Sequence, residues 1–354
     1  MNSMNVFIRA DASYEIGTGH VMRCLTLANH LRNKEINVIF LSRELTGDLC
    51  QYIEEKGFNV HCLSGGNPFL EENNWEKDAI ETISIIEEYQ GPKYIIVDHY
   101  ALDQNWEAKV RPFVKKIMVI DDLANRVHDC DLLLDQNLYE DMQTRYNGLV
   151  SQNCKIFLGP KYALLREEFI EARKTLSERS GKVKRILVFF GGSDPTNESI
   201  KVLRSLEHMD LKEITIDVVV GKSNLRKQEI ENICNQHENM NYYCQIENMA
   251  ELMVKADLAI GAGGSTTWER CYLGLPTITI IVAENQYLTT KAVEKAGAIL
   301  NLGCHSEVSN QDIENALELV LNHPTFLRGM SRKALEIVGQ SNHMDRLLYE
   351  FIEG

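Results

Sequence analysis

Short apolar runs alternate along the chain with segments of helical period. In the first half the apolar runs predict strands at residues 6–10, 37–41, 59–63, 94–97, 117–120 and 132–134. Most of these runs do not alternate with polar residues, which is typical of parallel strands that are covered on both faces. Between them, apolar positions spaced three to four residues apart predict helices, including one that begins near Val21 and others at 45–56 and 77–89.

The second half repeats this pattern. Its apolar runs predict strands at residues 185–190, 214–220, 241–244, 258–260 and 277–282, and the last helices at about 310–321 and 325–338. The short polar segment 180–184 separates the two halves. We therefore predict an α/β protein of two Rossmann-like domains facing a cleft, at residues 1–180 and 181–354, with the last helix a candidate for packing back on the first domain. Glycine-bearing loops follow strands in both halves, where open parallel sheets bind ligands.

The net charge of the chain limits the classes of binding partner that it favours. The 37 Lys and Arg residues against 51 Asp and Glu give a formal net charge of −14. This balance argues against nucleic acid or an anionic membrane surface as the main partner, because both favour a basic face. An anionic small ligand remains compatible, because backbone N–H groups at a helix start can hold it.

Cysteine usage and the N-terminal segment predict a soluble, cytoplasmic protein. The nine cysteines form no CxxC pair and no zinc-ligand spacing, as expected for reduced thiols. Arg9 and Asp11 lie where a signal peptide would need its apolar stretch. The longest apolar runs are too short to cross a bilayer.

The first candidate for chemistry is the sequence Gly17-Thr18-Gly19-His20. Gly17 and Gly19 permit a tight turn and a close approach of the backbone to a ligand. His20 then falls in the first helical turn, where the helix dipole disfavours the imidazolium, so we expect a neutral imidazole that can accept a proton from water. A capping or packing histidine is the alternative. The loop lacks the third glycine of the dinucleotide fingerprint, which argues against NAD.

A second glycine loop follows the predicted strand 185–190. Gly191, Gly192 and Ser193 expose backbone N–H groups, and Thr196 or Asn197 could start the next helix. This loop is a candidate cradle for a diphosphate or a sugar. An ordinary strand-to-helix turn is the alternative, and no Gly-Lys-Ser/Thr follows, so it is not a P-loop.

A third loop, residues 261–269 (GAGGSTTWE), joins glycines to a hydroxyl cluster at a helix start. Its candidate ligand contacts are Gly263, Gly264, Ser265, Thr266 and Glu269. The N–H groups and hydroxyls suit phosphate oxygens, and Glu269 is placed to accept hydrogen bonds from ribose hydroxyls. For Glu269, favourable charge placement in a first helical turn is the alternative.

Other polar residues follow predicted strands. Asn285 and Gln286 are ligand contacts or a simple helix cap, and Asp11, Asp98 and Tyr100 are candidate substrate contacts that could orient a polar sugar or His20 itself. At least one of the neighbouring carboxylates Asp121 and Asp122 is better explained as a structural cap. No ligand spacing accompanies these carboxylates, so no metal site is predicted.

Taken together, these segments resemble the PseG family, the UDP-sugar hydrolases of pseudaminic acid biosynthesis, which are related in fold to the MurG-type GT-B glycosyltransferases. The resemblance is carried by RADAS, IGTGHVMRCLTLA, VDHYALD, IDDLANRVHDCDLLLDQN, GPKYALLREEF, FFGGSDPTN, GAGGSTTWERCYLGLP and AENQ. These motifs run from Arg9 to Gln286. Proteins of spore-coat polysaccharide synthesis share much of the pattern.

The resemblance implies a GT-B-like fold and hydrolysis of UDP-2,4-diacetamido-2,4,6-trideoxy-β-L-altropyranose to UDP and the free sugar, without a metal or other cofactor. It implies that His20 is catalytic and that the segment 263–269 holds the uridine and diphosphate. His20 would then remove a proton from water, which attacks the anomeric carbon. The predicted partner is a small-molecule UDP-sugar, with no nucleic acid and no membrane, and a monomer is compatible with the sequence.

Two other functions remain open from the sequence. A GT-B glycosyltransferase would pass the sugar to an acceptor other than water. A non-catalytic protein would bind the sugar nucleotide without turnover.

Overall fold

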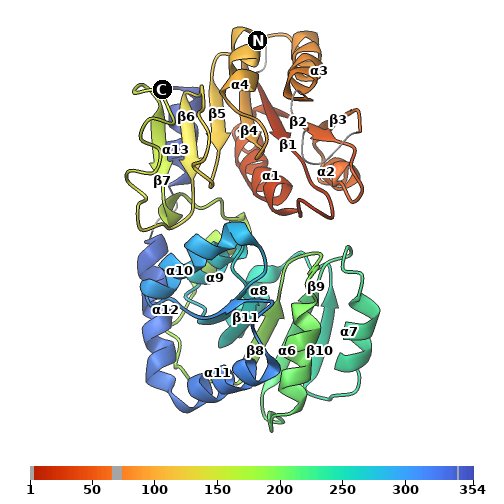
Figure 1. Cartoon of the computed structure of the whole chain (residues 1–354), viewed down its shortest axis with the longest axis vertical. Coiled ribbons are helices and arrows are strands. Elements are labelled where there is room, and N and C mark those ends of the chain that lie inside the picture. The colour runs from red at the N-terminus through yellow and green to blue at the C-terminus, as the bar shows by residue number, and fades with distance from the viewer. Residues whose placement is uncertain (1–3, 66–73, 341–342) are drawn as a thin grey trace. The chain divides into compact units, whose positions relative to one another are not determined.

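The computed structural model describes residues 4–65, 74–340 and 343–354, and its chain divides into two compact α/β units (Figure 1). The first unit spans Met1–Asn137, Asp141–Leu164 and His343–Gly354. The second spans Leu138–Glu140 and Leu165–Asn342. The predicted fold class, two α/β domains with parallel sheets, is confirmed.

In the described part of the first unit, one 7-stranded parallel sheet has the order β3-β2-β1-β4-β5-β6-β7. Its strands are β1 (Asn5–Ala10), β2 (Asn37–Arg43), β3 (Asn59–Leu63), β4 (Lys93–Asp98), β5 (Ile117–Ile120), β6 (Leu132–Asp135) and β7 (Lys155–Leu158). Every residue of β1 is buried, as the unbroken apolar run predicts for a central strand.

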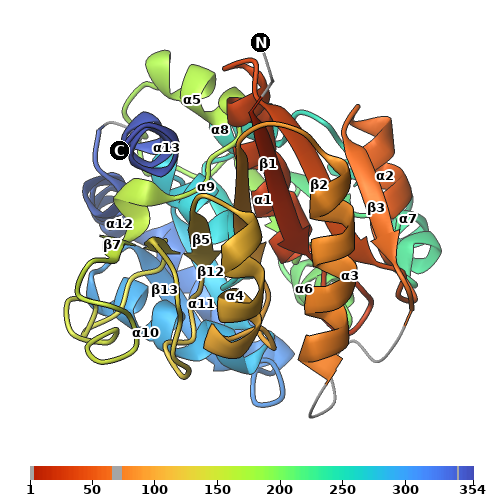
Figure 2. The same cartoon turned by 90° about the horizontal axis from the view of Figure 1, so that it is seen from above.

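Helices cover both faces of this sheet (Figure 2). They are α1 (Gly19–Arg32), α2 (Cys50–Glu55), α3 (Asn74–Glu88), α4 (Gln104–Val110) and α13 (Met344–Ile352). Successive residues of β1 point to opposite faces: Val6 and Ile8 pack in the core with α1 and α13, and Phe7 packs in the core with α3 and α4. The final helix of the chain therefore completes the core of the first unit.

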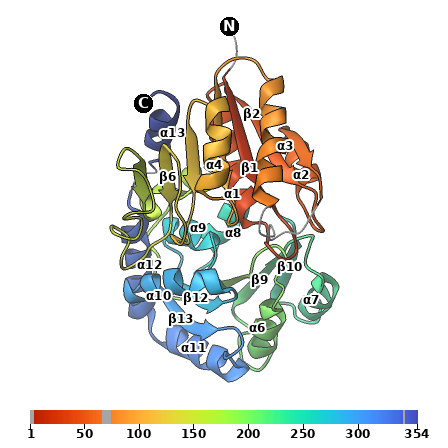
Figure 3. The ribbon, with the colours of Figure 1, turned by 45° about the horizontal axis from the view of Figure 1, so that its top comes forward.

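In the described part of the second unit, a 6-stranded parallel sheet has the order β10-β9-β8-β11-β12-β13. Its strands are β8 (Arg185–Phe189), β9 (Thr215–Val220), β10 (Met240–Cys244), β11 (Leu258–Ala262), β12 (Thr277–Ile281) and β13 (Ile299–Cys304). The helices are α5 (Glu167–Lys174), α6 (Glu198–Glu207), α7 (Lys227–Cys234), α8 (Met249–Lys255), α9 (Thr266–Tyr272), α10 (Tyr287–Lys295), α11 (Asn310–Asn322) and α12 (Pro324–Val338). Helices α6 and α11 lie side by side against one apolar core (Figures 1 and 3).

The strand order reverses once in each sheet, and the candidate loops follow the strands at that point. In the first sheet β1 is flanked by β2 and β4, so the loop carrying His20 and the strand end at Asp98 are neighbours. In the second sheet β8 pairs with β11, so the glycine loops after these two strands are neighbours. Such switch points are where open α/β sheets bind ligands.

The predicted strands coincide closely with observed ones, but some elements were not predicted. The edge strand β7, the polar-interrupted strand β13 and helix α13 had too few uninterrupted apolar residues to be identified. The predicted helix at 45–56 was wrong at its start, because α2 begins at Cys50. Gly47 adopts a φ of 85°, and the carboxylate of Asp48 accepts a hydrogen bond from the Cys50 N–H, so a turn precedes the helix.

Residues 165–180, placed before the expected boundary, belong to the second unit. Two arginines attach this segment to carbonyl groups there. Arg173 donates to the carbonyl of Tyr272 at the end of α9. Arg179 donates to the carbonyl of Met253 at 2.9 Å and to that of Leu273. Carbonyls at helix ends lack intrahelical partners, so cations stabilise them.

A fully buried ion network ties β1 to α3 and β2. Arg9 donates to Asp78 at 2.7 Å and also pairs with Asp11. Asp78 accepts further hydrogen bonds from Arg43 at 2.5 Å and from the indole N–H of Trp106 at 2.9 Å. Burial raises the pKa of Asp78, but the charges of Arg9 and Arg43 hold the pKa of this carboxyl below its usual range.

We predict that Asp78→Asn destabilises the first unit by about 3–5 kcal/mol, because it leaves buried arginines without their anion. In the unchanged protein this contribution is fully present above pH about 4 and is lost as the pH falls through the lowered pKa of Asp78. Hydrogen exchange of β1 peptides in a urea titration measures the loss. Glu76→Gln, which removes a partly exposed partner of Lys109, is the control, and equal effects of the two variants would contradict the prediction.

Candidate functional site

His20 and Asp98 form a buried pair at the carboxyl ends of β1 and β4. His20 is the second residue of α1, and Asp98 is the last residue of β4. Nδ1 of His20 lies 2.5 Å from Oδ1 of Asp98. Both residues are buried, with 7% of His20 and 1% of Asp98 exposed. The expected histidine therefore has a specific acidic partner.

Arg23 holds Asp98 in place and was not predicted. It lies one turn after His20 on the same face of α1, and it donates to both oxygens of Asp98 at 2.6 Å. It also donates to Asp122 at 2.9 Å. The spacing of three residues between His20 and Arg23 was visible in the sequence. Their carboxylate partners were not, because these lie far away along the chain.

The charge on Asp98 decides the tautomer of His20. Burial raises the pKa of Asp98, but the charge of Arg23 and the contact with His20 hold it well below its usual range. An ionised carboxylate only accepts, so Nδ1 of His20 carries the proton and Nε2 is the basic nitrogen. Arg23 also lies 3.3 Å from Nδ1, but a guanidinium only donates and so forms no hydrogen bond with a protonated Nδ1.

Tyr100 contacts the ring of His20 edge-on, with ring centroids 4.5 Å apart at 84°. The structure thus brings three of the predicted residues, His20, Asp98 and Tyr100, into one group. The ring contact limits how the imidazole can tilt.

Asp11, predicted as a substrate contact, is engaged within the protein. It pairs with Arg9, lies 3.1 Å from Nε2 of His99 and accepts the Arg43 N–H at 2.7 Å. Only 3% of it is exposed. These contacts hold Asp11 in place at the start of the loop that leads to His20.

The two glycines of the first loop differ. Gly17 has a φ of 81°, and its N–H donates to the carbonyl of Ser13 at 2.8 Å, so the turn needs a glycine there. A Cβ added to Gly19 would meet no atom within 4 Å, so the first unit places no steric demand on that position.

Asp121 has a structural role. Its carboxylate pairs with Arg126 at 2.7 Å and accepts a hydrogen bond from the Ala124 N–H, and its carbonyl accepts from the Tyr146 hydroxyl at 2.9 Å. We expected at least one of Asp121 and Asp122 to be a structural cap. Asp121 fits this expectation, whereas Asp122 contacts Arg23.

In the second unit, the loop after β8 is closely packed. Gly191 has a φ of 92°. A Cβ on Gly221 would lie 2.4 Å from the carbonyl oxygen of Gly192, so the loop and the end of β9 approach closely. Ser193 lies in this loop. Asn197 precedes the first residue of α6, as expected, but its side chain makes no capping hydrogen bond. Asp194 instead accepts the Glu198 and Ser199 N–H groups at 3.0 and 2.9 Å.

Gly263 and Gly264 lie against Gln286. The Gln286 side-chain oxygen accepts the Val282 N–H at 3.1 Å, and its amide nitrogen would be 3.6 Å from a Cβ on Gly264. A Cβ on Gly263 would lie 2.2 Å from the hydroxyl of Thr290. Three predicted contacts, Gly263, Gly264 and Gln286, thus lie together. Ser265, before α9, and Asn285, in η3 (Glu284–Gln286), are exposed.

A buried cation lies beneath this loop and was not predicted. Arg270 is 2% exposed and donates to the carbonyl of Ala262 at 2.6 Å and to the hydroxyls of Thr266 and Thr267 at 3.2 Å. Burial lowers its pKa to about 10, so the guanidinium stays charged near neutral pH. Among the described residues, no carboxylate forms an ion pair with Arg270.

Glu269 is held by one oxygen only. Its Oε1 accepts from Arg166 at 3.0 Å, and its Oε2 is buried without a hydrogen-bond partner. An unpartnered buried carboxylate oxygen is costly unless a ligand donates to it.

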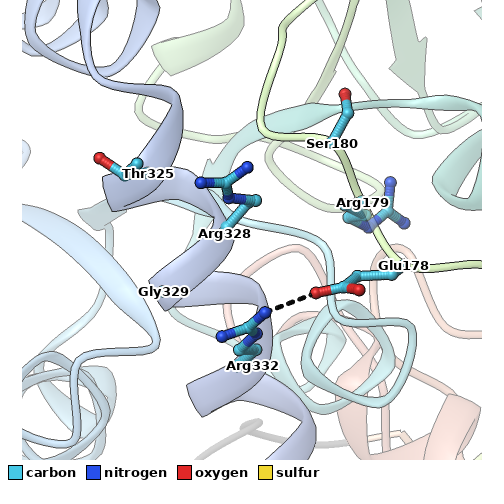
Figure 4. A pocket seen from close by; sticks show the side chains of 7 residues that line it. All are labelled: Glu178, Arg179, Ser180, Thr325, Arg328, Gly329 and Arg332. Carbon is cyan, nitrogen blue, oxygen red and sulfur yellow. Dashed lines mark hydrogen bonds and ion pairs between the residues drawn. The ribbon is translucent and has the colours of Figure 1, made fainter.

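A cavity of about 510 Å³ lies in the second unit between α12 and the segment before β8 (Figure 4). Its lining residues are Glu178, Arg179, Ser180, Thr325, Arg328, Gly329 and Arg332. No predicted site residue lines it. Among the residues described, no three His, Cys, Asp or Glu side chains are grouped as metal ligands, and no helix is long and apolar enough to cross a membrane.

Comparison with known proteins gives several matches. The sequence profile of the glycosyltransferase family 28 C-terminal domain matches residues 186–347. A protein of Campylobacter jejuni named UDP-2,4-diacetamido-2,4,6-trideoxy-beta-L-altropyranose hydrolase is 29% identical over 295 residues, which cover 83% of this chain and 97% of that protein. This match supports the assignment of the chain to a PseG-like family.

Other relatives of this PseG-like chain differ in length or in sequence. An uncharacterized protein of Methanocaldococcus jannaschii is 32% identical over 80% of this chain, which spans only 57% of that protein. The crystal structure of Acinetobacter baumannii MurG has a TM-score of 0.68 at 13% identity, covering 99% of this chain and 100% of that one. This similarity shows the GT-B fold. The family 28 match includes the loops after β8 and β11, and His20 lies outside it.

We predict that the neutral imidazole of His20 in this PseG-like protein carries its proton on Nδ1. Two-bond ¹⁵N–¹H couplings of histidine-labelled protein identify the protonated nitrogen, and His20→Gln assigns the signal. Asp98→Asn replaces the anion with an amide that can donate or accept, so the preference for Nδ1 should weaken. A proton found on Nε2 in the unchanged protein would refute the assigned pairing.

We also predict that Gly263→Ala destabilises the second unit by about 1–3 kcal/mol, because the new methyl group overlaps the hydroxyl of Thr290. Gly264→Ala, whose Cβ makes an ordinary contact, is the matched control. Adding Thr290→Ala to Gly263→Ala should recover most of the loss. Urea unfolding of the unchanged protein, Gly263→Ala, Thr290→Ala and the double variant forms a double-mutant cycle, and additive effects would contradict the overlap.

Proposed function

We propose that this chain hydrolyses a UDP-linked sugar to UDP and the free sugar, with His20 as the general base. The observation that carries the proposal is the Asp98–His20 pair, because it leaves a basic Nε2 on a histidine at a switch point of the sheet. The name of the Campylobacter jejuni relative supports hydrolysis and favours the diacetamido-trideoxy-altrose nucleotide as substrate.

In the proposed reaction, Nε2 of His20 takes a proton from water, and the water oxygen forms a bond to the anomeric carbon. The bond between that carbon and the diphosphate oxygen breaks, and UDP leaves with the electron pair. Asp98 stabilises the imidazolium that forms, as carboxylates do for catalytic histidines in other enzymes. Arg23 acts as a positioning residue, because it keeps Asp98 ionised and oriented.

The second unit would bind the UDP group. We propose that the diphosphate contacts the loop 263–266, where the buried charge of Arg270 lacks a carboxylate partner among the described residues. The free Oε2 of Glu269 would accept from a ribose hydroxyl, with Arg166 orienting the other oxygen. Gly191, Gly192, Ser193, Asn285 and Gln286 remain proposed contacts.

A glycosyltransferase is the second candidate. The family 28 profile favours it, because the matching domain is named for glycosyltransferases. The two functions differ in whether UDP is released from the sugar nucleotide when water is the only acceptor.

We predict that the protein releases UDP from the diacetamido-trideoxy-altrose nucleotide without an acceptor and in the presence of EDTA. His20→Asn should lower turnover by about 10²–10⁴-fold, because it removes general-base assistance. UDP affinity, measured by calorimetry, should change little. His30→Asn, near the other end of α1, is the control. Equal turnover in His20→Asn would remove His20 from the mechanism.

Reaction in ¹⁸O-labelled water tests which bond breaks. Label in the free sugar supports attack at carbon, and label in UDP refutes it. UDP binding without release of UDP from any UDP-sugar tested would instead favour the transferase or the non-catalytic binding protein.

A further inference from the structure

Two thiols lie together at the amino ends of neighbouring strands in the first unit. Cys130 precedes β6 and Cys154 precedes β7, and these strands pair in parallel at the edge of the sheet (Figure 1). The Sγ atoms are 3.6 Å apart. Cys130 is buried, whereas Cys154 is partly exposed. One thiol is therefore accessible to a reagent, and the other is within reach of it.

The surrounding backbone fixes this arrangement. The N–H of Lys155 donates to the carbonyl of Asp131 at 2.9 Å, and the N–H of Cys154 donates to the carbonyl of Ser151 at 3.0 Å. A disulfide has an S–S bond of about 2.05 Å, so the sulfurs need to approach by only about 1.5 Å. Side-chain rotation supplies such a movement without displacing the strands.

The two thiols have different acidities. The hydrogen bond with Cys130 lowers the pKa of Cys154, although burial and the charges of Asp131 and Glu107 oppose this. The same hydrogen bond, together with burial, raises the pKa of Cys130. Because the thiolate is the reactive form, Cys154 is the thiol that an oxidant meets first.

We propose that Cys130 and Cys154 form a peroxide-sensitive dithiol that closes to an intrachain disulfide. The thiolate of Cys154 attacks one oxygen of hydrogen peroxide, which breaks the O–O bond and yields a sulfenic acid and hydroxide. The sulfur of Cys130 then attacks the sulfur of Cys154 and displaces hydroxide, while its own proton goes to water. Overall, two thiols and one peroxide give one disulfide and two waters.

The disulfide would join the two ends of the segment 130–154, which contacts residues beside the candidate site. Between the cysteines, Arg145 donates to the carbonyl of Asp122 at 3.1 Å, and the hydroxyl of Tyr146 donates to the carbonyl of Asp121 at 2.9 Å. The cysteines themselves lie at the amino ends of the strands, whereas His20 and Asp98 lie at the carboxyl ends. Oxidation should therefore stabilise the first unit without removing a residue of the candidate site.

The test treats the full chain with limiting hydrogen peroxide and maps the peptides by mass spectrometry without reduction. We expect one cross-linked pair containing Cys130 and Cys154, with a mass loss of two hydrogen atoms and reversal by dithiothreitol. The thermal midpoint should rise by several degrees. Both effects should disappear in Cys154→Ser, which changes the more exposed member of the pair.

Cys62→Ser is the matched control, because exposed Cys62 also neighbours a buried thiol, that of Cys50. The 130–154 link should persist in this variant. Sulfinic or sulfonic acid at Cys154 without a cross-link would overturn the proposal, as would a link of Cys154 to another cysteine. A cross-linked protein with an unchanged or lower thermal midpoint would refute its stabilising role. These readouts do not require any enzymatic activity.

Discussion

The pairing of buried charges is the constraint on which the first unit depends. Asp98 and Asp78 are both excluded from water, and each is surrounded by cations from elements distant in the sequence. Removing one partner from such a group leaves an uncompensated charge, so the group forms as a whole or not at all. This requirement fixes α1 and α3 against the strands and sets the position of His20 relative to Asp98.

The same principle explains why the two units differ at their switch points. In the first unit His20, Arg23 and Asp98 are paired with one another, so the geometry of this group is determined without a ligand. In the second unit, Arg270 has hydrogen bonds but no carboxylate partner among the described residues, and one oxygen of Glu269 has no partner. The second unit therefore holds unsatisfied polar groups beside a glycine loop, which is the pattern expected of a ligand-binding site.

The sequence singled out individual residues but did not show which of them contact one another. His20, Asp98 and Tyr100 were each singled out because they follow strands, and they do lie together. Asp11 was singled out for the same reason, yet its carboxylate is engaged by Arg9, His99 and the Arg43 backbone. Position at a strand end does not reveal which way a carboxylate faces, because that depends on side chains from other strands.

The sequence by itself determined the order of most strands and of several helices, the two α/β halves and the glycine loops, because apolar periodicity and glycine placement act locally. Only the tertiary structure decided the strand order, the partners of Asp98 and Glu269, the buried position of Arg270 and the assignment of residues 165–180 and of α13. One physical reason applies to all of these features. A buried charge, carbonyl or thiol is paired with a group from an element that the fold brings near. Because that element can lie far away along the chain, no local sequence pattern reveals the pairing.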